Sequence, residues 1–162
     1  MKVKNKINSY PMEQLAPIIC GFLNKGKKVI VPARGNSMRP LVRNAKDSVI
    51  LTAYKGQPVG VGDAVFYRRN NGTYVLHRIV NVDKYGKLIL MGDNQCIEEK
   101  GIHTEDIVAI PVAFIRGEKP IYCDSLGYKR YAKFWAKTRF LRRVYRKYFQ
   151  IRTKIASKII RF

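Results

Sequence analysis

The middle of the chain, residues 29–124, constrains the fold most, because short apolar runs alternate there with turn-forming residues. Runs rich in β-branched residues predict strands. Asn70-Asn71-Gly72 and Lys84-Tyr85-Gly86 each separate two such runs and so predict hairpins. Several short strands with no long helix between them predict an antiparallel, mostly β domain. The expected strands are Val29 to Pro32, Ser48 to Tyr54, Ala64 to Arg69, Thr73 to Val82, Lys87 to Met91 and Ile107 to Arg116.

The two ends of the chain differ from this middle region in charge and in periodicity. Residues 1–28 form a basic lead-in, within which a short amphipathic helix is expected from about residue 12 to 24. Residues 125–162 contain 13 Lys and Arg residues and no Asp or Glu, in a chain whose net charge is +21. We therefore expect three regions: a basic lead-in (1–28), a β domain (29–124) and a basic helical tail (125–162).

The basic tail has the period of an amphipathic helix, because its apolar residues recur at spacings of three and four. Lys and Arg fill most of the remaining positions, so an anionic membrane surface is the expected partner. The apolar face could instead pack on the β domain. Nucleic acid is a less favoured partner, although Tyr and Phe between basic residues would also suit it. The apolar residues are Leu141, Val144, Tyr148, Ile151, Ile155, Ile159 and Phe162.

Composition argues against several other classes of protein. No stretch reaches the ~18 apolar residues that a membrane-spanning helix needs, so any membrane attachment is expected to be peripheral. The cytoplasmic side is the default, since no export signal is evident. Cys20, Cys96 and Cys123 are far apart and form no CxxC, so neither a disulfide framework nor a metal site is expected. No other cofactor is expected.

Three short segments carry residues suited to chemistry. Gly35-Asn36-Ser37-Met38-Arg39-Pro40 follows an expected strand, and its glycine permits a tight turn that presents the serine. Strand alternation places His77 on a face with apolar residues, either as a buried core histidine or as a general base in a dry environment. Met91-Gly92-Asp93-Asn94 is a turn by default, and its acid could orient the imidazole.

Together these segments resemble the clan of serine peptidases that contains the signal peptidases and the LexA-type repressors. The resemblance rests on GxSMxP, then a strand with His-Arg-Ile, then Gly-Asp-Asn, and it covers roughly residues 29–117. In that clan a serine attacks the peptide carbonyl and a lysine usually serves as base. His77 stands at the lysine position. This is similar to the Ser-His signal peptidases of the endoplasmic reticulum, archaea and some Gram-positive bacteria.

The resemblance implies an endopeptidase that cleaves a leader or signal peptide, with Ser37 as nucleophile and His77 as general base. An acid would orient His77, and two candidates remain open. Asp93 matches the aspartate of the family's Gly-Asp-Asn. Glu99 lies in Glu98-Glu99-Lys100-Gly101, which is similar to an acidic pair in the endoplasmic reticulum enzymes.

The resemblance also bears on the groups that would hold the substrate and the oxyanion. Gly35 stands where many signal peptidases carry a serine whose hydroxyl stabilises the developing charge. The backbone amide of Ser37 and the side chain of Asn36 are the remaining donors. Met38 and Pro40 complete this expected substrate-binding or oxyanion segment.

Two other functions remain open at this stage. The first is a relative without catalytic activity that binds peptides in the same groove, which would lack a correctly placed acid beside His77. The second is a nucleic-acid-binding protein acting through residues 125–162. A repressor of the LexA type is a poorer match, because 28 residues cannot hold the N-terminal helix-turn-helix that such repressors need.

Overall fold

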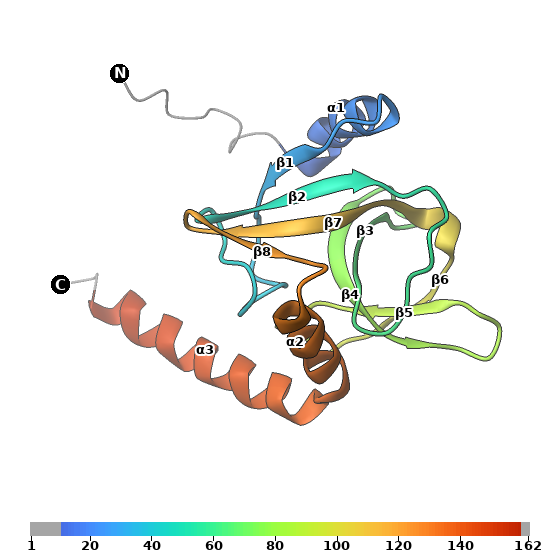
Figure 1. Cartoon of the computed structure of the whole chain (residues 1–162). Coiled ribbons are helices and arrows are strands. Elements are labelled where there is room, and N and C mark those ends of the chain that lie inside the picture. The colour runs from blue at the N-terminus through green and yellow to red at the C-terminus, as the bar shows by residue number, and fades with distance from the viewer. Residues whose placement is uncertain (1–10, 160–162) are drawn as a thin grey trace, which may run out of the picture.

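The protein, seen here as a computed structural model, is described for residues 11–159, without the side chains of residues 139 and 154–159. Its centre is an eight-stranded antiparallel sheet in the order β1-β2-β7-β3-β4-β5-β6, with β8 paired to β7 (Figure 1). The strands are β1 (Val29–Pro32), β2 (Asp47–Ala53), β3 (Ala64–Arg68), β4 (Tyr74–Val82), β5 (Leu88–Met91), β6 (Glu99–Ile102), β7 (Ile107–Arg116) and β8 (Lys119–Tyr122).

The prediction of a mostly β fold is confirmed, and the six expected strands are present to within one residue at each end. The sequence analysis missed β6 and β8. β6 consists of Glu-Lys-Gly-Ile, and β8 contains Pro120, so neither has the composition of a strand. Each pairs with one neighbouring strand, β6 with β5 and β8 with β7. Tertiary pairing therefore decides the conformation of these two segments.

The sheet is buried on both faces, because side chains alternate between two hydrophobic cores. In β3, Phe66 points into a core shared with α1 and β2, whereas Val65 and Tyr67 point into a second core with Ile79 of β4. This period of two is the one that the sequence of β4 predicts. All of these side chains are buried, so the register of β3 against β4, with Val65 opposite His77, is strongly specified.

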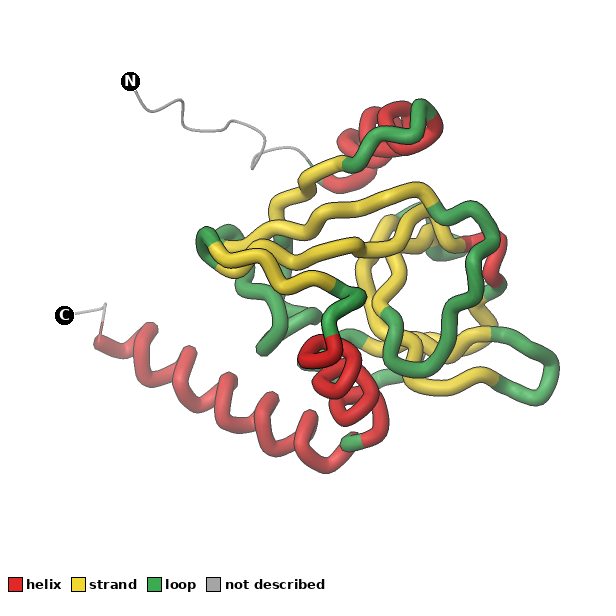
Figure 2. The backbone as a smooth tube through the Cα atoms, in the orientation of Figure 1, coloured by secondary structure: helices red, strands yellow, loops and turns green. Residues whose placement is uncertain are grey.

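The three α-helices lie near two edges of the sheet in Figure 2, one helix beside β1 and two beyond the end of β8. α1 (Met12–Asn24) has the bounds that the sequence predicts, and it buries Ala16, Ile19 and Leu23 against the sheet. α2 (Leu126–Lys137) begins at Ser125, whose side chain accepts a hydrogen bond from the backbone N–H of Tyr128 at 3.3 Å. α2 lies near the end of β8 (Figure 1), and its Tyr128 and Ala132 join Ile19 and Leu23 of α1 in one hydrophobic core.

The basic tail is helical, as expected, but it forms two helices, α2 and α3 (Arg139–Ile159), which meet at Thr138. The predicted apolar stripe of α3 does not pack on the β domain: Val144, Tyr148 and Ile151 are exposed. The face carrying Arg142 lies against the rest of the protein instead. Among the described residues, no helix has the length and apolar character required to cross a bilayer. Ile155, Ile159 and Phe162 lie outside the described side chains.

Candidate active site

Ser37 lies in the loop between β1 and β2, and hydrogen bonds pin the base of this loop. The backbone N–H of Ala33 donates to the carbonyl oxygen of Asp47 at 2.8 Å, and that of Gly35 donates to Oδ1 of Asn44 at 3.0 Å. Gly35 has φ +73°, a conformation that side chains disfavour, so a glycine is needed at this turn. The turn leaves the Ser37 side chain partly exposed.

Asp47 closes the same loop at its far end. Its carboxylate accepts hydrogen bonds from the backbone N–H of Arg43 at 2.7 Å and from that of Gly117 at 3.0 Å, and it forms an ion pair with the Arg43 guanidinium at 2.7 Å. Burial alone would raise the pKa of Asp47, yet these hydrogen bonds lower it to about 2. The loop that carries Ser37 is therefore held by an ionised carboxylate at neutral pH.

The Gly92-Asp93-Asn94 turn lies directly against Ser37. The backbone N–H of Asn94 donates to the carbonyl oxygen of Ser37 at 2.7 Å. A Cβ atom at Gly92 would lie 2.7 Å from that oxygen and 3.0 Å from Cβ of Ser37, so only glycine allows this approach. The structure therefore brings together the first and third of the segments that the sequence singles out.

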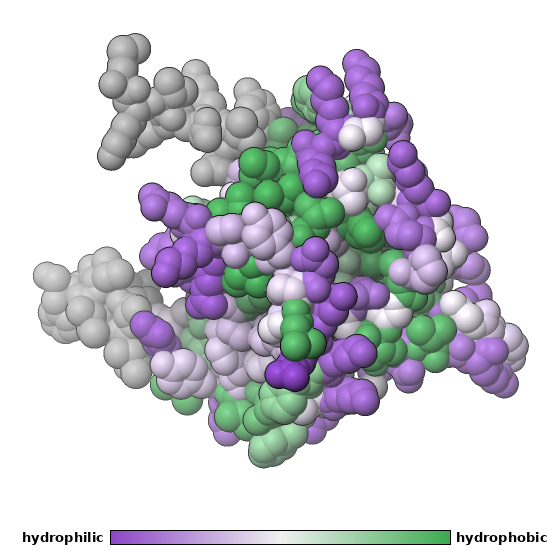
Figure 3. Space-filling view, viewed as in Figure 1, coloured by the Kyte–Doolittle hydropathy of each residue, from purple (hydrophilic) through white to green (hydrophobic). Residues whose placement is uncertain are grey.

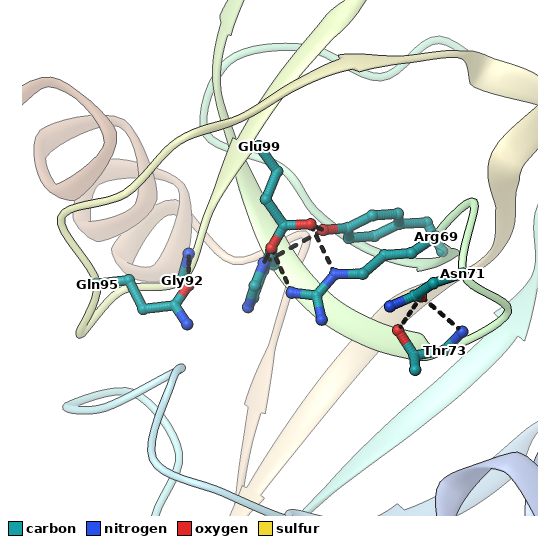
Figure 4. Close-up of polar contacts among 8 residues, drawn as sticks. Arg69, Asn71, Thr73, Gly92, Gln95 and Glu99 are labelled. Atoms are coloured by element: carbon teal, nitrogen blue, oxygen red, sulfur yellow. Dashed lines mark hydrogen bonds and ion pairs between the residues drawn. The ribbon is translucent and has the colours of Figure 1, made fainter.

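His77 belongs to a polar cluster in the second core, where its side chain is almost completely buried. Its Nδ1 lies 3.1 Å from Oε1 of Glu99. Tyr67 donates its hydroxyl proton to Oε2 of Glu99 at 2.6 Å, and Arg69 bonds both oxygens, with Nε at 2.7 Å from Oε2 and Nη2 on Oε1. Figure 4 shows Glu99 reaching from its own strand toward the guanidinium of Arg69. Glu99 thus accepts a hydrogen bond on each of its four lone-pair sites.

These contacts fix the ionisation of Glu99 and with it the tautomer of His77. Burial would raise the pKa of Glu99, but the hydrogen bonds from His77, Arg69 and Tyr67 hold it well below its usual range. Burial and the bond to Glu99 raise the pKa of the Tyr67 phenol. An ionised carboxylate only accepts, so Nδ1 of His77 carries the proton toward Glu99. The Nε2 atom is then the one left to exchange a proton with a reacting group.

Asp93, the other acid left open by the sequence, has different contacts. Arg78 donates to its two carboxylate oxygens, from Nε and from Nη2, at 2.7 Å each, and Tyr131 of α2 donates at 3.2 Å. Both side chains of the Arg78–Asp93 pair are fully buried. The pKa of Arg78 is raised despite its burial, because Asp93 stabilises its charge. Of the two candidate acids, Glu99 contacts His77 and Asp93 contacts Arg78.

Ser37 and His77 lie at the same end of the β4–β5 pair. Met91, the last residue of β5, pairs with Arg78 beside His77, and Gly92 then passes under Ser37. Within the described residues, the Ser37 hydroxyl makes no hydrogen bond with the imidazole. The turn that begins at Gly92 therefore links Ser37 to the strand pair that carries His77.

Ser37 borders a hollow of about 150 Å³ with mostly apolar walls. One wall is the backbone from β1 to the Ser37 loop (residues 31–35), and the other is the start of β4 (residues 74–76). Residues 74–76 pair with β3 along one edge, whereas the pairing of β4 with β5 begins at Arg78. β1 likewise pairs only with β2 among the described strands. Both walls therefore present strand edges that an extended peptide could pair with.

The other expected substrate-binding or oxyanion residues have distinct positions. Asn36 is exposed, and its side-chain oxygen accepts a hydrogen bond from Nε of Arg39 at 2.9 Å, which leaves its NH₂ group able to donate elsewhere. Met38 is buried and lines the hollow beside Ser37. Pro40 lines a different hollow, next to Tyr131 of α2, so the structure does not bring it to the Ser37 hollow.

A larger hollow, of about 600 Å³, lies between the sheet and the start of α2, and it contains neither Ser37 nor His77. Cys123 lines it, and burial raises the pKa of this thiol to about 12, so it is protonated at neutral pH and a poor nucleophile. In the part of the chain that the structure describes, no cluster of His, Cys, Asp and Glu residues could hold a metal ion. The larger hollow therefore lacks the reactive groups that the sequence predicts, and the smaller hollow is the one that Ser37 borders.

Tyr67 and Arg69 are residues of the site that the sequence analysis missed. They lie two apart at the end of β3, on the face that Val65 shares with His77 across the strand pair. The hairpin register, read outward from Asn70-Asn71-Gly72, carries this information, because it places Tyr67 next to the His77 face. Glu99 belongs to β6, which has no strand signal of its own, so its approach to Arg69 could not be read from the sequence.

Comparison with protein-family models finds no match to this chain, and comparison with curated proteins finds none either.

Proposed function

We propose that this protein is a serine endopeptidase of the signal-peptidase type that cleaves a leader or signal peptide. The observation that carries the proposal is the contact between His77 and the ionised carboxylate of Glu99, on the strand pair whose following turn lies against Ser37. A serine hydroxyl needs an adjacent base to become a nucleophile, and an oriented imidazole supplies one. The resemblance of the three sequence segments to that clan supports the same assignment.

In the proposed reaction, Nε2 of His77 takes the hydroxyl proton of Ser37 as Oγ attacks the scissile carbonyl carbon. The tetrahedral intermediate collapses when the C–N bond breaks and His77 gives the proton to the leaving amine. Water then attacks the acyl-enzyme as His77 accepts its proton, and when the ester C–Oγ bond breaks His77 returns the proton to Oγ, which restores the serine and releases a carboxylic acid. Glu99 stays ionised throughout and stabilises the imidazolium that forms twice. The amide of Ser37 and the NH₂ group of Asn36 are the candidate donors to the oxyanion.

The hollow suits an extended peptide with an apolar side chain near the scissile bond. Its lining includes Val31, Phe66 and Leu76. The unpaired edges at residues 31–35 and 74–76 would hold the peptide backbone by strand pairing. The proposed substrate class is therefore an extended segment with apolar residues.

A peptide-binding relative without catalytic activity is the second candidate, because Ser37 and His77 are not hydrogen-bonded to each other in the described residues. Catalytic hydrogen bonds are often long without substrate and tighten when it binds. The same hollow and strand edges serve both candidates. Only reactivity at Ser37 separates them.

The test is covalent labelling of Ser37 with an acylating β-lactam-type inhibitor, followed by intact mass and peptide mapping. Wild type is expected to gain one adduct on Ser37, and Ser37→Ala and His77→Ala are expected to gain none. Ser48→Ala, a serine of β2 outside the hollow, serves as matched control and is expected to label like wild type. Absence of both labelling and leader-peptide cleavage in wild type would favour the non-catalytic peptide-binding protein.

A further inference from the structure

Specific contacts hold one face of α3 against the rest of the protein. Arg142 is only 1% exposed, and it donates from Nε to the carbonyl oxygen of Trp135 at 3.0 Å and from Nη1 to that of Gly92 at 2.9 Å. Seven residues further on, the Phe149 ring lies under the guanidinium of Arg39, 4.5 Å from Cζ to the ring centroid. Residues seven apart share a helix face, so these contacts fix the rotation of α3 about its axis.

The opposite face of α3 exposes a regular row of apolar side chains, between 37% and 57% exposed. Figure 3 shows hydrophobic side chains along the lower edge of the molecule, where Figure 1 places α3. In the sequence, Ile155 and Ile159 continue the same spacing. A continuous apolar row on a helix surface indicates a partner that covers it. This row, the α3 stripe, consists of Leu141, Val144, Tyr148 and Ile151.

Cationic side chains border the α3 stripe along its length. Arg143 and Lys147 follow it on one side and Arg152 on the other, at the helical spacing, and all three are exposed. The whole segment 125–162 contains 13 basic residues and no acidic residue. The partner must therefore be apolar beneath the stripe and anionic along its borders.

We propose that the α3 stripe docks in the interface of an anionic lipid bilayer, with the helix lying parallel to the surface. Three of its four side chains are aliphatic, so they cannot stack on bases as a nucleic-acid site requires, whereas acyl chains accept them readily. Lipid phosphates on both sides would meet Arg143, Lys147 and Arg152. The alternation of an aliphatic row with cationic borders is the pattern of a helix that lies in a membrane interface.

Docking through the α3 stripe would also position the Ser37 loop. The inward face of α3 contacts Gly92, which lies under Ser37, and Arg39, two residues after it. The loop would stay close to the lipid surface, where a peptide emerging from the membrane could reach the hollow. The membrane inference does not depend on Ser37 being a nucleophile, so the two proposals can fail separately.

The first test is flotation of the full chain with vesicles of phosphatidylcholine alone or mixed equally with phosphatidylglycerol. Wild type is expected to float only with the mixed vesicles. Val144→Ser with Ile151→Ser keeps every charge and is expected to weaken binding at least about tenfold, because aliphatic groups drive insertion. Leu126→Ser, at an exposed apolar position of α2 outside the stripe, is the matched control and is expected to bind like wild type. Equal binding by wild type and the double variant would overturn the proposal.

The second test measures depth and does not rely on a weakened variant. Trp135 is buried, so brominated lipids should not quench its fluorescence in wild type. In Tyr148→Trp the new indole on the stripe is expected to be quenched when brominated anionic vesicles are added. Failure of this quenching would overturn the proposal. So would salt-sensitive binding to RNA or DNA combined with no binding to anionic vesicles.

Discussion

His77 and Arg78 are neighbours on β4, and each is bound to a carboxylate, but on opposite faces of the sheet. The Arg78–Asp93 pair is completely buried beneath α2, whereas the carboxylate facing His77 is 22% exposed and shares its charge with Arg69. Arginine keeps its proton at every working pH, so its pair can only hold structure. A histidine, unlike an arginine, can take up and release a proton, so its pair can serve proton transfer.

β4 thus places a structural ion pair on one face of the sheet and a histidine suited to proton transfer on the other. Arg78 also donates to the carbonyl oxygen of Gly62 at 2.7 Å, and Tyr131 bonds Asp93, so this pair ties α2 to the sheet. His77 contacts Glu99 and Tyr67 through Nδ1, and within the described residues no hydrogen bond of its Nε2 is present. Substitutions on the Arg78 face should therefore lower mainly the stability of the fold. Substitutions on the His77 face should cost less stability and should lower the reactivity of Ser37.

The largest loss of stability is expected for Asp93→Asn, because it leaves the buried charge of Arg78 uncompensated. Removing one partner of a buried pair costs about 3–5 kcal/mol. The free energy of unfolding from urea denaturation should fall by that amount. Adding Arg78→Met to Asp93→Asn removes the orphaned charge and should recover part of the loss. A loss below about 1 kcal/mol for Asp93→Asn would contradict a structural role of the pair.

Glu99→Gln is expected to cost less, about 1–3 kcal/mol, because the released Arg69 is 32% exposed and can turn to water. The same urea experiment, run beside Asp93→Asn, compares the two faces directly. A loss from Glu99→Gln that equals or exceeds the loss from Asp93→Asn would reverse the comparison.

Lowering the pH should reduce the folding stability through the protonation of Glu99, on the His77 face of the sheet. The folded protein lowers the pKa of Glu99 below its ordinary value of 4.5, so the unfolded chain binds a proton first as pH falls. The stability that Glu99 contributes is complete above pH 4.5 and is lost progressively as pH drops further. Urea midpoints between pH 6 and pH 3 should fall less steeply in Glu99→Gln than in wild type. Asp47, whose pKa is also lowered, should leave a residual slope, and identical slopes would be inconsistent with this account.

The smallest effect is expected for Tyr67→Phe, which removes one hydroxyl and keeps the buried ring. Glu99 loses one of its donors but retains Arg69 and His77, so the expected loss of stability is about 1 kcal/mol. Thermal unfolding by circular dichroism measures it. A loss as large as that of Asp93→Asn would mean that the phenol, and not the carboxylate, organises the cluster.

Much of the fold and part of the site could be predicted from the sequence. The alternation in β4 predicts that His77 faces a core, and the turn sequences predict the hairpins that set its register against β3. The partner of His77 could not be predicted, because Glu99 sits on β6, a strand formed by pairing with β5 and not by its own composition. Asp93, which directly follows Gly92, pairs with Arg78 and not with His77.

Which face of α3 points toward solvent also could not be predicted from sequence patterns. Periodicity identifies the apolar face of α3 correctly, yet periodicity alone predicts that this face packs inward as readily as outward. The outward orientation depends on Arg142, which bonds the carbonyl oxygen of nearby Trp135 and also that of Gly92, which is 50 residues away in the sequence. Such long-range contacts carry no local signal.

The rate of Ser37 acylation in Glu99→Gln measures whether Glu99 activates the serine through His77. Ile107→Val, a conservative change in the core beside His77, controls for a modest loss of stability. If Glu99 orients His77, the labelling rate should fall by about 10²–10⁴ in folded Glu99→Gln and stay near that of wild type in Ile107→Val. Labelling of Glu99→Gln at the wild-type rate would contradict the account, because the carboxylate would then hold the fold and take no part in activating the serine.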